Sequence, residues 1–556
     1  MGGNPRATVD APVESPPSAL AEPSFYPHAP GRVTVHETHI SWVFLAGERA
    51  YKLKKPIRLG FLDYSTPVRR RRMCQQEVRL NRRLAPALYL GVRAIAKGEE
   101  GLVLAPEEDP RAVDYLVEMR RYDEDSTLAA SLARGELRCA EMAVVGRVLA
   151  RFHERAQRVR ARVNAAELRR VVSENCRELM DLAEHRAEPE RVLALERFLL
   201  AFLAAHADTL DRRAGCGLVR EGHGDLRAEH VLLDGEVQIV DCVEFDKRLR
   251  DVDVADDLSF LVMDLAHRGG GRYAQALVDG YRAAGGDPGE ENLLAFYASH
   301  RALVRAKVEL LEAGQVPPGS SGRGRHEAEA RELIALAQRF AWRARTPLVI
   351  VVCGVPAAGK SQLAGALAAA SGLAHLNSDI VRKQLAGLGP GGRGSSALYT
   401  EEWNRRTYRE LGGQAASELA RHGGAVVDAT FRHRADRDAF TSAFAHAAPA
   451  VFVECVAPAS VLARRAAGRA RQPGNASDAS PAVVERERLA WEPLGEIDAG
   501  DHLLVRSDRS LDAIIADVCA LLDLRMARLG ARASGARDGG GGRSDSDSGG
   551  AGGQQG

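Results

Sequence analysis

The sequence predicts two domains of different fold class, an α+β domain followed by an α/β domain built on a parallel sheet. Three observations predict this order. The chain has 556 residues, too many for one hydrophobic core. Residues 314–325 (GQVPPGSSGRGR) form a Pro/Gly/Ser cluster that is typical of a linker. On each side of this cluster, strand and helix patterns enclose a separate set of polar residues suited to phosphate chemistry.

The composition favours a cytoplasmic protein. The net charge is +1, so composition gives no support for a nucleic acid or an acidic membrane as partner. The eight cysteines form no C-x-x-C pair, which argues against a zinc site or a disulfide framework and for a reducing compartment. No apolar run approaches the roughly 20 residues of a membrane span, and the N-terminus lacks the hydrophobic core of a signal peptide.

Composition also sets the expected domain boundaries. Residues 1–24 are rich in Pro, Ala and Ser, and residues 529–556 are rich in Gly and Ser, so both tails are expected to be disordered. The two ordered domains are expected at 25–313 and 346–528. Between them, residues 314–345 are expected to form the linker and one helix.

The α/β domain is predicted from the stretch 349–361. The apolar, β-branched run from Val349 to Cys353 indicates a buried strand, and the alanine-rich segment after Ser361 is a strong helix former. Between them the chain fits G-x-x-x-x-G-K-[ST] at every fixed position, the pattern of a phosphate-binding loop, or P-loop. In such a loop backbone N–H groups cradle the phosphates of ATP, the lysine reaches the β- and γ-phosphates, and the serine binds Mg²⁺. The predicted ATP-binding residues are Gly354, Val355, Pro356, Ala357, Ala358, Gly359, Lys360 and Ser361.

Two acidic residues farther along this domain are predicted to complete the site. Asp379 is expected at the end of a short strand, with Arg382 one helical turn later, so that both point toward the triphosphate. A carboxylate there can activate an acceptor hydroxyl, and an arginine can hold a phosphate. The alternative for Asp379 is a helix N-cap. Asp428 follows the apolar strand 425–427, which is the position of a carboxylate that supports Mg²⁺.

An arginine-rich segment follows the next predicted strand, residues 451–456. This segment contains Arg464, Arg465, Arg469 and Arg471, followed by Pro473, Gly474 and Asn475. We expect a lid that closes over the phosphates, with Arg464 and Arg469 in contact with them. The alternative is a plain solvated helix.

The first domain is predicted to hold a second set of catalytic residues around a β-hairpin. Strand patterns at 39–57 and a helix at 69–84 come first. Farther on, a polar loop with Asp225 leads into a hairpin at 231–240, and Asp241 follows its second strand. The two carboxylates can therefore converge on one site. One can accept the proton of a substrate hydroxyl and the other can hold Mg²⁺ against the phosphates.

Other readings of this segment stay open. Asp225 could be a turn residue, and His223 could be a core histidine with a satisfied hydrogen bond. A cluster of four carboxylates follows, and we expect it to be surface and helix-cap charge rather than a metal site: Asp251, Asp253, Asp256 and Asp257.

The segment H-G-D-L, followed by a hairpin and I-V-D, resembles the catalytic and metal segments of aminoglycoside phosphotransferase-like kinases, which are relatives of protein kinases. The resemblance covers most of residues 32–310 and implies a two-lobed, kinase-like α+β fold. It implies that Lys52 pairs with the phosphates of ATP, with Lys54 on the same face as the alternative, and that Glu77 pairs with that lysine. It also implies that Asp225 is the catalytic base and Asp241 a metal ligand.

His230 departs from the pattern of that family. Five residues after the base, these kinases usually have an asparagine that binds the metal, and here the position holds His230. Mg²⁺ prefers oxygen ligands, for which imidazole is a poor substitute. His230 is retained as a candidate metal ligand, and the departure bears on the activity of the first domain.

Residues 346–525 resemble P-loop small-molecule and polynucleotide kinases, including zeta-toxin-like and chloramphenicol phosphotransferase-like enzymes, through the P-loop and the segment S-D-I-V-R-K-Q-L. The order of the two halves resembles bacterial proteins described as bifunctional aminoglycoside phosphotransferase/ATP-binding proteins. We therefore expect a kinase that uses ATP and Mg²⁺ to phosphorylate a small hydroxyl-bearing acceptor. The alternative is a regulatory ATP-binding protein with an inactive kinase-like domain and a switch-like P-loop ATPase. A nucleic-acid end kinase is disfavoured by the near-zero net charge.

Overall fold

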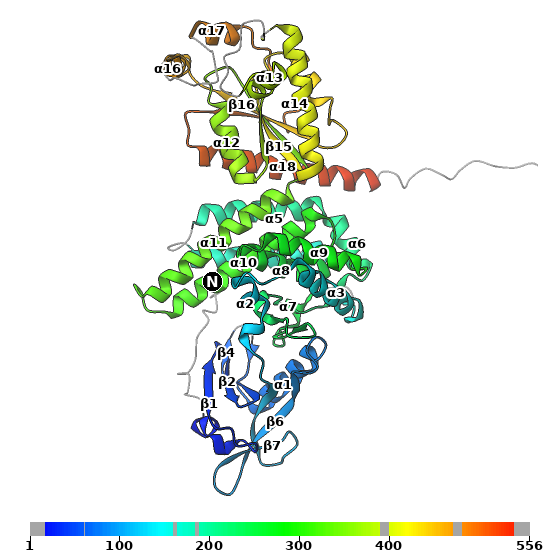
Figure 1. Ribbon diagram of the computed structural model, residues 1–556, viewed down its shortest axis with the longest axis vertical. Coiled ribbons are helices and arrows are strands. Elements are labelled where there is room, and N and C mark those ends of the chain that lie inside the picture. Colours follow the sequence, from blue (N-terminus) through cyan, green and yellow to red (C-terminus); the bar gives the residue numbers. More distant parts are fainter. Residues whose placement is uncertain are drawn as a thin grey trace, which may run out of the picture. The chain divides into compact units, whose positions relative to one another are not determined.

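The computed structural model describes residues 17–59, 62–159, 164–183, 188–389, 398, 400–470 and 481–538. They form two compact units that alternate along the chain (Figure 1). The described residues up to 164 and those at 212–302 make up one, called here the N-terminal unit. Residues 165–211 and those from 303 onward make up the other, called the P-loop unit. The linker composition predicted a single boundary at 313, whereas the structure places residues 165–211 in the P-loop unit.

The N-terminal unit begins with a six-stranded antiparallel sheet in the order β1-β2-β3-β8-β6-β7. Its strands are β1 (Val33–Glu37), β2 (Ser41–Ala46), β3 (Arg49–Lys54), β6 (Tyr89–Lys97), β7 (Leu102–Pro106) and β8 (Ala112–Arg120), with a small hairpin of β4 (Arg58–Leu59) and β5 (Leu62–Asp63) after β3. Alternate residues of β3 face opposite sides of the sheet. Tyr51 and Leu53 pack with Trp42 in one cluster, so Lys52 and Lys54 both face the other side, where α1 (Pro67–Asn81) lies.

The outer face of this sheet is covered by a segment expected to be disordered. Residues 17–25 instead form two short helices, η1 (Ser18–Ala21) and η2 (Pro23–Phe25). Leu20 is fully buried, and the Tyr26 hydroxyl donates a hydrogen bond to its carbonyl at 2.7 Å. The prediction of disorder for 1–24 is therefore wrong for residues 17–24, because their apolar side chains cover the sheet. Residues 1–16 lie outside the described part.

The rest of the N-terminal unit is mainly helical and carries the two predicted acids in the segments before and after a short hairpin. Its elements are η3 (Glu124–Ser126), α2 (Leu128–Ala133), α3 (Cys139–Arg155), β9 (Val219–Glu221), η4 (Ala228–His230), β10 (Val231–Leu232), β11 (Gln238–Ile239), α7 (Lys247–Arg250), β12 (Asp251–Asp253), α8 (Val254–His267) and α9 (Gly271–Ala283). The predicted hairpin is confirmed: β10 and β11 pair antiparallel. Its residues Leu232 and Val240 pack with Val117 of the sheet and Val78 of α1, which fixes the hairpin against the face that carries Lys52.

The P-loop unit is built on a five-stranded sheet in which neighbouring strands run parallel, in the order β14-β15-β13-β16-β17. The strands are β13 (Leu348–Cys353), β14 (Ala374–Asn377), β15 (Gly424–Asp428), β16 (Ala450–Val456) and β17 (His502–Arg506). Every residue of β13 is buried. Ile350 and Val352 face one core cluster, and Val349 and Val351 face another. Burial on both faces explains why the strand is continuously apolar.

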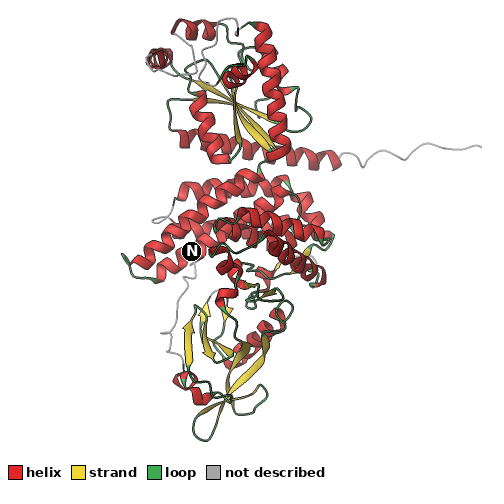
Figure 2. Cartoon of the chain, in the orientation of Figure 1, coloured by secondary structure: helices red, strands yellow, loops and turns green. Residues whose placement is uncertain are grey.

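Helices cover both faces of this sheet (Figure 2). The cluster around Ile350 includes residues of α12 (Lys360–Ser371), α16 (Ala459–Ala470), α17 (Pro481–Leu489) and α18 (Leu511–Asp538). The cluster around Val349 includes residues of α13 (Ser378–Leu385), α14 (Glu401–His422) and α15 (Arg434–Thr441). Because α18 continues to residue 538, the disorder expected from 529 is wrong for residues 529–538. Residues 539–556 lie outside the described part.

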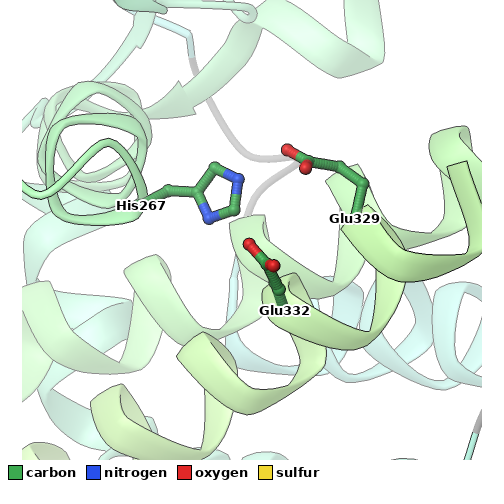
Figure 3. Close-up of side chains that lie close together, drawn as sticks. All are labelled: His267, Glu329 and Glu332. Atoms are coloured by element: carbon green, nitrogen blue, oxygen red, sulfur yellow. The ribbon is translucent and has the colours of Figure 1, made fainter. Parts of the chain in front are cut away.

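A second layer of helices contributes to the P-loop unit. Helices α4 (Ala165–Ala183), α5 (Pro189–Ala205) and α11 (Ser321–Ala344) lie wholly in it, whereas α6 (Ala207–Gly215) and α10 (Glu291–Gln315) each cross the boundary between the units. The expected linker 314–325 is reduced to residues 316–320, since the helices reach into both of its ends. On α11, Ala330, Leu333, Ile334 and Ala337 are buried at helical spacing. Glu329 and Glu332 lie one turn apart on the same helix (Figure 3).

A buried ion pair joins this layer to the sheet. Asp523 of α18 is 1% exposed, and its carboxylate lies 2.7 Å from Arg345 at the end of α11 and 3.5 Å from Arg197 of α5. The Arg345 guanidinium stacks on Phe198 of α5, 4.6 Å from the ring centre. Close packing continues at Gly530, where an added Cβ would lie 2.3 Å from the Ala205 Cα. Helix α5 is therefore an integral part of the P-loop unit.

In the described part of the chain, every helix is too short or too polar to cross a lipid bilayer.

We expect Arg345→Met to destabilise the P-loop unit by about 2–3 kcal/mol, because a buried carboxylate loses its main partner. The exposed neighbour Arg343→Met is the control. The double variant Arg345→Met/Asp523→Leu should recover most of the loss, because it removes the unpaired charge as well. Hydrogen exchange of β13 and β16 amides measures the change. Equal protection in Arg345→Met and the control would contradict the structural role.

Candidate functional site

The predicted P-loop has the backbone geometry that phosphate binding requires. Gly354 has φ +133°, and a Cβ there would lie 2.5 Å from the carbonyl oxygen of Cys455, so only glycine fits. Gly359, at φ +95°, precedes the first residue of α12, which is Lys360. The Lys360 ammonium donates to the Val355 carbonyl at 3.0 Å and therefore lies across the loop. The N-terminus of α12 and the loop N–H groups form the expected anion site.

Asp428 ends β15 beside this loop. Parallel pairing sets it opposite Val352 of β13 and Asn377 of β14. The Asn377 amide donates to its carboxylate at 2.8 Å. Burial opposes the charge, but His375, Lys360 and the Ser361 hydroxyl together lower the pKa of Asp428 below its usual value. The Asp428 carboxylate is therefore ionised, and it lies next to Ser361, the second residue of α12.

Asp379 lies in α13, the helix that follows β14. The predicted strand ends two residues earlier, at Asn377, so the expectation that Asp379 ends a strand is wrong. The side chain of Asn377 caps the helix by accepting from the N–H groups of Asp379 and Ile380 at 3.0 and 3.1 Å. Asn377, and not Asp379, is therefore the N-cap of α13. Arg382 donates to Asp379 at 3.2 Å and to Asn404 of α14 at 2.9 Å.

The surroundings of Asp379 favour its protonated form more than water does. Burial raises the pKa of this carboxyl, and the nearby cations Arg382 and Lys360 only partly offset that effect. A carboxylate with a raised pKa is a stronger proton acceptor. The effects of Lys360 and Asp428 on Asp379 also show that these three groups share one electrostatic environment.

The arginine of α16 that contacts the P-loop is Arg465. Its guanidinium donates to the Ser507 carbonyl and hydroxyl, each at 2.9 Å, and to the Ala358 carbonyl at 3.4 Å. Of the predicted phosphate contacts, Arg464 is exposed on the same helix, and the side chain of Arg469 lies outside the described part. The predicted lid residues 471–475 also lie outside it. Adjacent residues of a helix lie only about 100° apart, so the packing of α16 through the buried Leu462 decides that Arg465 rather than Arg464 meets the P-loop.

Arg437 is a further structural residue that no sequence pattern indicates. It is 1% exposed and donates to the carbonyls of Phe431, Glu492 and Pro493 at 2.9–3.2 Å. Phe431, three residues after Asp428, has φ +52°. Arg437 therefore fixes the path of the chain as it leaves the acidic end of β15. A surface arginine on an amphipathic helix has the same sequence pattern, so only the fold reveals it.

In the N-terminal unit, two lysines on one face of β3, Lys52 and Lys54, share Glu77 of α1. Lys52 lies 3.0 Å from Glu77 and 2.8 Å from Asp241, and Lys54 lies 2.6 Å from Glu77. Lys54 also pairs with Glu244, which accepts from the Tyr64 hydroxyl at 2.8 Å. Burial disfavours charge on Lys52, but Asp241 and Glu77 outweigh it and hold its pKa well above the usual value.

The two lysines differ in exposure. The Lys54 side chain is fully buried among its partners, whereas that of Lys52 retains 17% exposure and meets Asp241. Lys52 is thus the lysine that faces the predicted metal ligand. Asp241 has φ +60°, a left-handed conformation that is uncommon outside glycine and often marks functional sites. The Lys52 ammonium lowers the pKa of Asp241 well below its usual range.

The loop that contains Asp225 is held by carboxylates of α8. Asp257 accepts from the N–H groups of His223 and Gly224 at 2.7 and 2.8 Å and contacts His153 at 3.0 Å. Asp264 accepts from the N–H of Ala228 at 2.8 Å. The acidic cluster is buried rather than on the surface. Asp253 caps α8 as expected and pairs with Arg213, while Asp256 pairs with Arg301.

Arg227 and His230 lie next to Asp225. Arg227 donates to both carboxylate oxygens of Asp225, each at 3.0 Å. The His230 Nδ1 lies 2.8 Å from the Asp225 carbonyl, and its Nε2 lies 3.2 Å from the Arg227 guanidinium. Arg227 had no assigned role in the sequence patterns, although it follows Asp225 by two residues.

His223 is a core histidine, the alternative considered from the sequence. It is fully buried, and its Nε2 donates to the Val240 carbonyl at 2.8 Å. Burial lowers the pKa of His223 to about 4. Its contact ties the catalytic loop to the end of the β10–β11 hairpin.

We expect the N-terminal unit to lose about 2 kcal/mol of stability between pH 7 and pH 5 through His223. The folded pKa lies below the unfolded value of about 6.5, so the unfolded chain binds a proton first and stability falls as pH drops toward 4. His223→Gln should flatten this slope, because glutamine does not titrate. Hydrogen exchange of β10 and β11 amides at both pH values measures it. Parallel slopes in the two proteins would contradict the assignment.

Comparison with known proteins places the chain in a family. Residues 349–494 match a family model described as "AAA domain". The chain is 32% identical over 477 residues to "Uncharacterized protein Rv2004c" of Mycobacterium tuberculosis, an alignment that covers 84% of this chain and 92% of that protein. "Uncharacterized protein Mb2027c" of Mycobacterium bovis matches to the same extent.

Solved structures with similarity to parts of the chain include kinases. A choline/ethanolamine kinase family protein from Mesorhizobium loti is 15% identical, with a TM-score of 0.37, over 57% of this chain and 93% of that one. A gluconokinase from Sinorhizobium meliloti is 23% identical, with a TM-score of 0.25, over 34% and 98%. The chain belongs to one family with the mycobacterial proteins Rv2004c and Mb2027c, each of which is 32% identical to it over 84% of its length.

Proposed function

We propose that this protein is an ATP-dependent phosphotransferase that moves the γ-phosphoryl group of ATP to a hydroxyl of a small molecule in the cytoplasm. The observation that carries the proposal is the grouping of three charged residues where the strands of the P-loop sheet end. There Lys360, Asp428 and Asp379 act on one another electrostatically, beside a loop shaped for a triphosphate. A nucleotide-hydrolysing switch needs the first two groups, whereas a carboxylate with a raised pKa suits proton removal from an acceptor.

In the proposed reaction Asp379 takes the proton of the acceptor hydroxyl. The acceptor oxygen forms a bond to the γ-phosphorus as the bond from that phosphorus to the β–γ bridging oxygen breaks, which releases ADP. Lys360 and the loop N–H groups stabilise the charge on the phosphates. Arg382 is held by Asp379 and Asn404, so its guanidinium has a fixed position from which to orient the acceptor or its transferred phosphate.

The donor groups at this edge fit Mg²⁺. Ser361 offers a hydroxyl and Asp428 an ionised carboxylate, and hard oxygen donors are what this ion prefers. When bound, Mg²⁺ neutralises charge on the phosphates. We assign Ser361 and Asp428 to it, directly or through water, and Asn377 keeps the carboxylate oriented by its hydrogen bond.

A second nucleotide site is proposed in the N-terminal unit. Lys52, fixed by Glu77, would pair with phosphates, Asp241 would hold the metal, and Asp225 would be the base. One observation favours the alternative of a regulatory, inactive kinase-like unit: both oxygens of Asp225 already accept hydrogen bonds from Arg227. An active unit needs at least one of the remaining lone pairs of Asp225 for the acceptor hydroxyl.

Asp379→Asn should lower phosphoryl transfer by at least about a hundredfold and leave ATP affinity within a few-fold, because proton removal and nucleotide binding are separate. Asp438→Asn, an exposed carboxylate of the same unit, is the control. The assay follows label from γ-³²P-ATP into a cellular metabolite pool. Near-normal transfer by Asp379→Asn would exclude it as the base, and label released only as free phosphate would favour the regulatory alternative.

Each nucleotide site can be removed alone. In equilibrium dialysis with the non-hydrolysable analogue AMPPNP, we expect two nucleotides per wild-type chain, one in Lys360→Ala, one in Lys52→Ala and none in the double variant. Each substitution removes the cation that faces the phosphates. The exposed Lys97→Ala is the control and should bind two. Two nucleotides bound to Lys360→Ala would contradict the P-loop assignment.

A further inference from the structure

Both ring nitrogens of His230 already have polar partners. The Nδ1 atom lies 2.8 Å from the Asp225 carbonyl. The Nε2 atom lies 3.2 Å from the Arg227 guanidinium and 3.8 Å from the Glu229 carboxylate.

Arg227 is itself held in place. Its side chain is 14% exposed, and it forms two hydrogen bonds with Asp225 and an ion pair with Glu229. Burial opposes its charge, but Asp225 and Glu229 outweigh that effect and raise its pKa above the usual value. The guanidinium is a permanent positive charge beside the proposed base.

These contacts do not fit the sequence-based assignment of His230 as a metal ligand. A cation bound at Nε2 would have to displace the Arg227 hydrogen bond and would lie against a buried positive charge. Asp241 is different: it is a carboxylate, the kind of oxygen ligand that divalent cations prefer, and it lies 2.8 Å from the Lys52 ammonium. Among the described residues of this unit, Asp241 thus offers an oxygen ligand for a divalent cation, whereas Arg227 lies beside the position for which the sequence pattern implies a second ligand.

We propose that the N-terminal unit binds its nucleotide with a single divalent cation, at Asp241, and that Arg227 supplies the positive charge of a second one. This inference rests on the proposed nucleotide site in that unit. In this arrangement Arg227 is a positioning residue for Asp225 and a fixed counter-charge for the phosphates. His230 contacts the guanidinium through its Nε2 atom.

The test counts ions and nucleotides bound to the full chain. Equilibrium dialysis with ⁵⁴Mn²⁺ and AMPPNP gives both numbers, and ions bound without AMPPNP are subtracted. We expect two nucleotides and two ions, one in each unit. In Arg227→Met/His230→Asn the second site regains an amide oxygen and loses the competing charge, so we expect two nucleotides and three ions. Arg134→Met, an exposed arginine of the same unit, should match the wild type.

Three outcomes would overturn the inference, and they differ from one another. Two nucleotides with three ions in the wild type would show a two-cation site. Two ions in both the wild type and the double variant would show that Arg227 is not what excludes the second cation. One nucleotide with one ion in the wild type would show that the N-terminal unit has no nucleotide site, and the proposed function of that unit would fail with it.

Discussion

The burial of β13 on both faces is the constraint on which the P-loop unit depends. A strand with no solvent-facing side must be covered by helices on each side, and its neighbours in the sheet run parallel to it. Parallel strands bring their carboxyl ends to one edge. For this reason three parts of the chain meet at this edge: the loop after β13, Asn377 at the end of β14 and Asp428 at the end of β15. About 75 residues of the chain separate the first from the last.

In the N-terminal unit, paired charges rather than parallel strands bring the candidate site residues together. Its sheet, helix α1 and the β10–β11 hairpin come together where Glu77 binds two lysines and one of them reaches Asp241. Buried carboxylates and lysines are costly to desolvate unless they pair. The pairing therefore fixes how α1 and the hairpin lie against β3. The fully buried Lys54, with Glu244 and Tyr64, stabilises this arrangement and leaves Lys52 toward the site.

In both units, side chains from the surrounding fold hold the backbone of the segments around the candidate site residues. In the N-terminal unit Asp257 and Asp264 accept from loop N–H groups, and in the P-loop unit Asn377 and Arg437 do comparable work at the ends of β14 and β15. Such contacts satisfy backbone groups that the irregular loops leave without partners. They also limit the motion of Asp225 and Asp379, which a positioned base requires.

The sequence by itself determined the P-loop, the order of the two candidate sites along the chain, and the hairpin between Asp225 and Asp241. These features depend on the spacing of a few neighbouring residues. Only the tertiary structure decided which of several similar residues faces a candidate site or caps a helix. It separated Lys52 from Lys54 by burial, Arg465 from Arg464 by the facing of one helix, and it assigned the cap of α13 to Asn377. It also placed α5 with the P-loop unit through Arg345 and Asp523, and Arg227 against His230. Those choices depend on contacts between residues far apart in the chain or on the direction of a side chain, which periodicity and composition do not record.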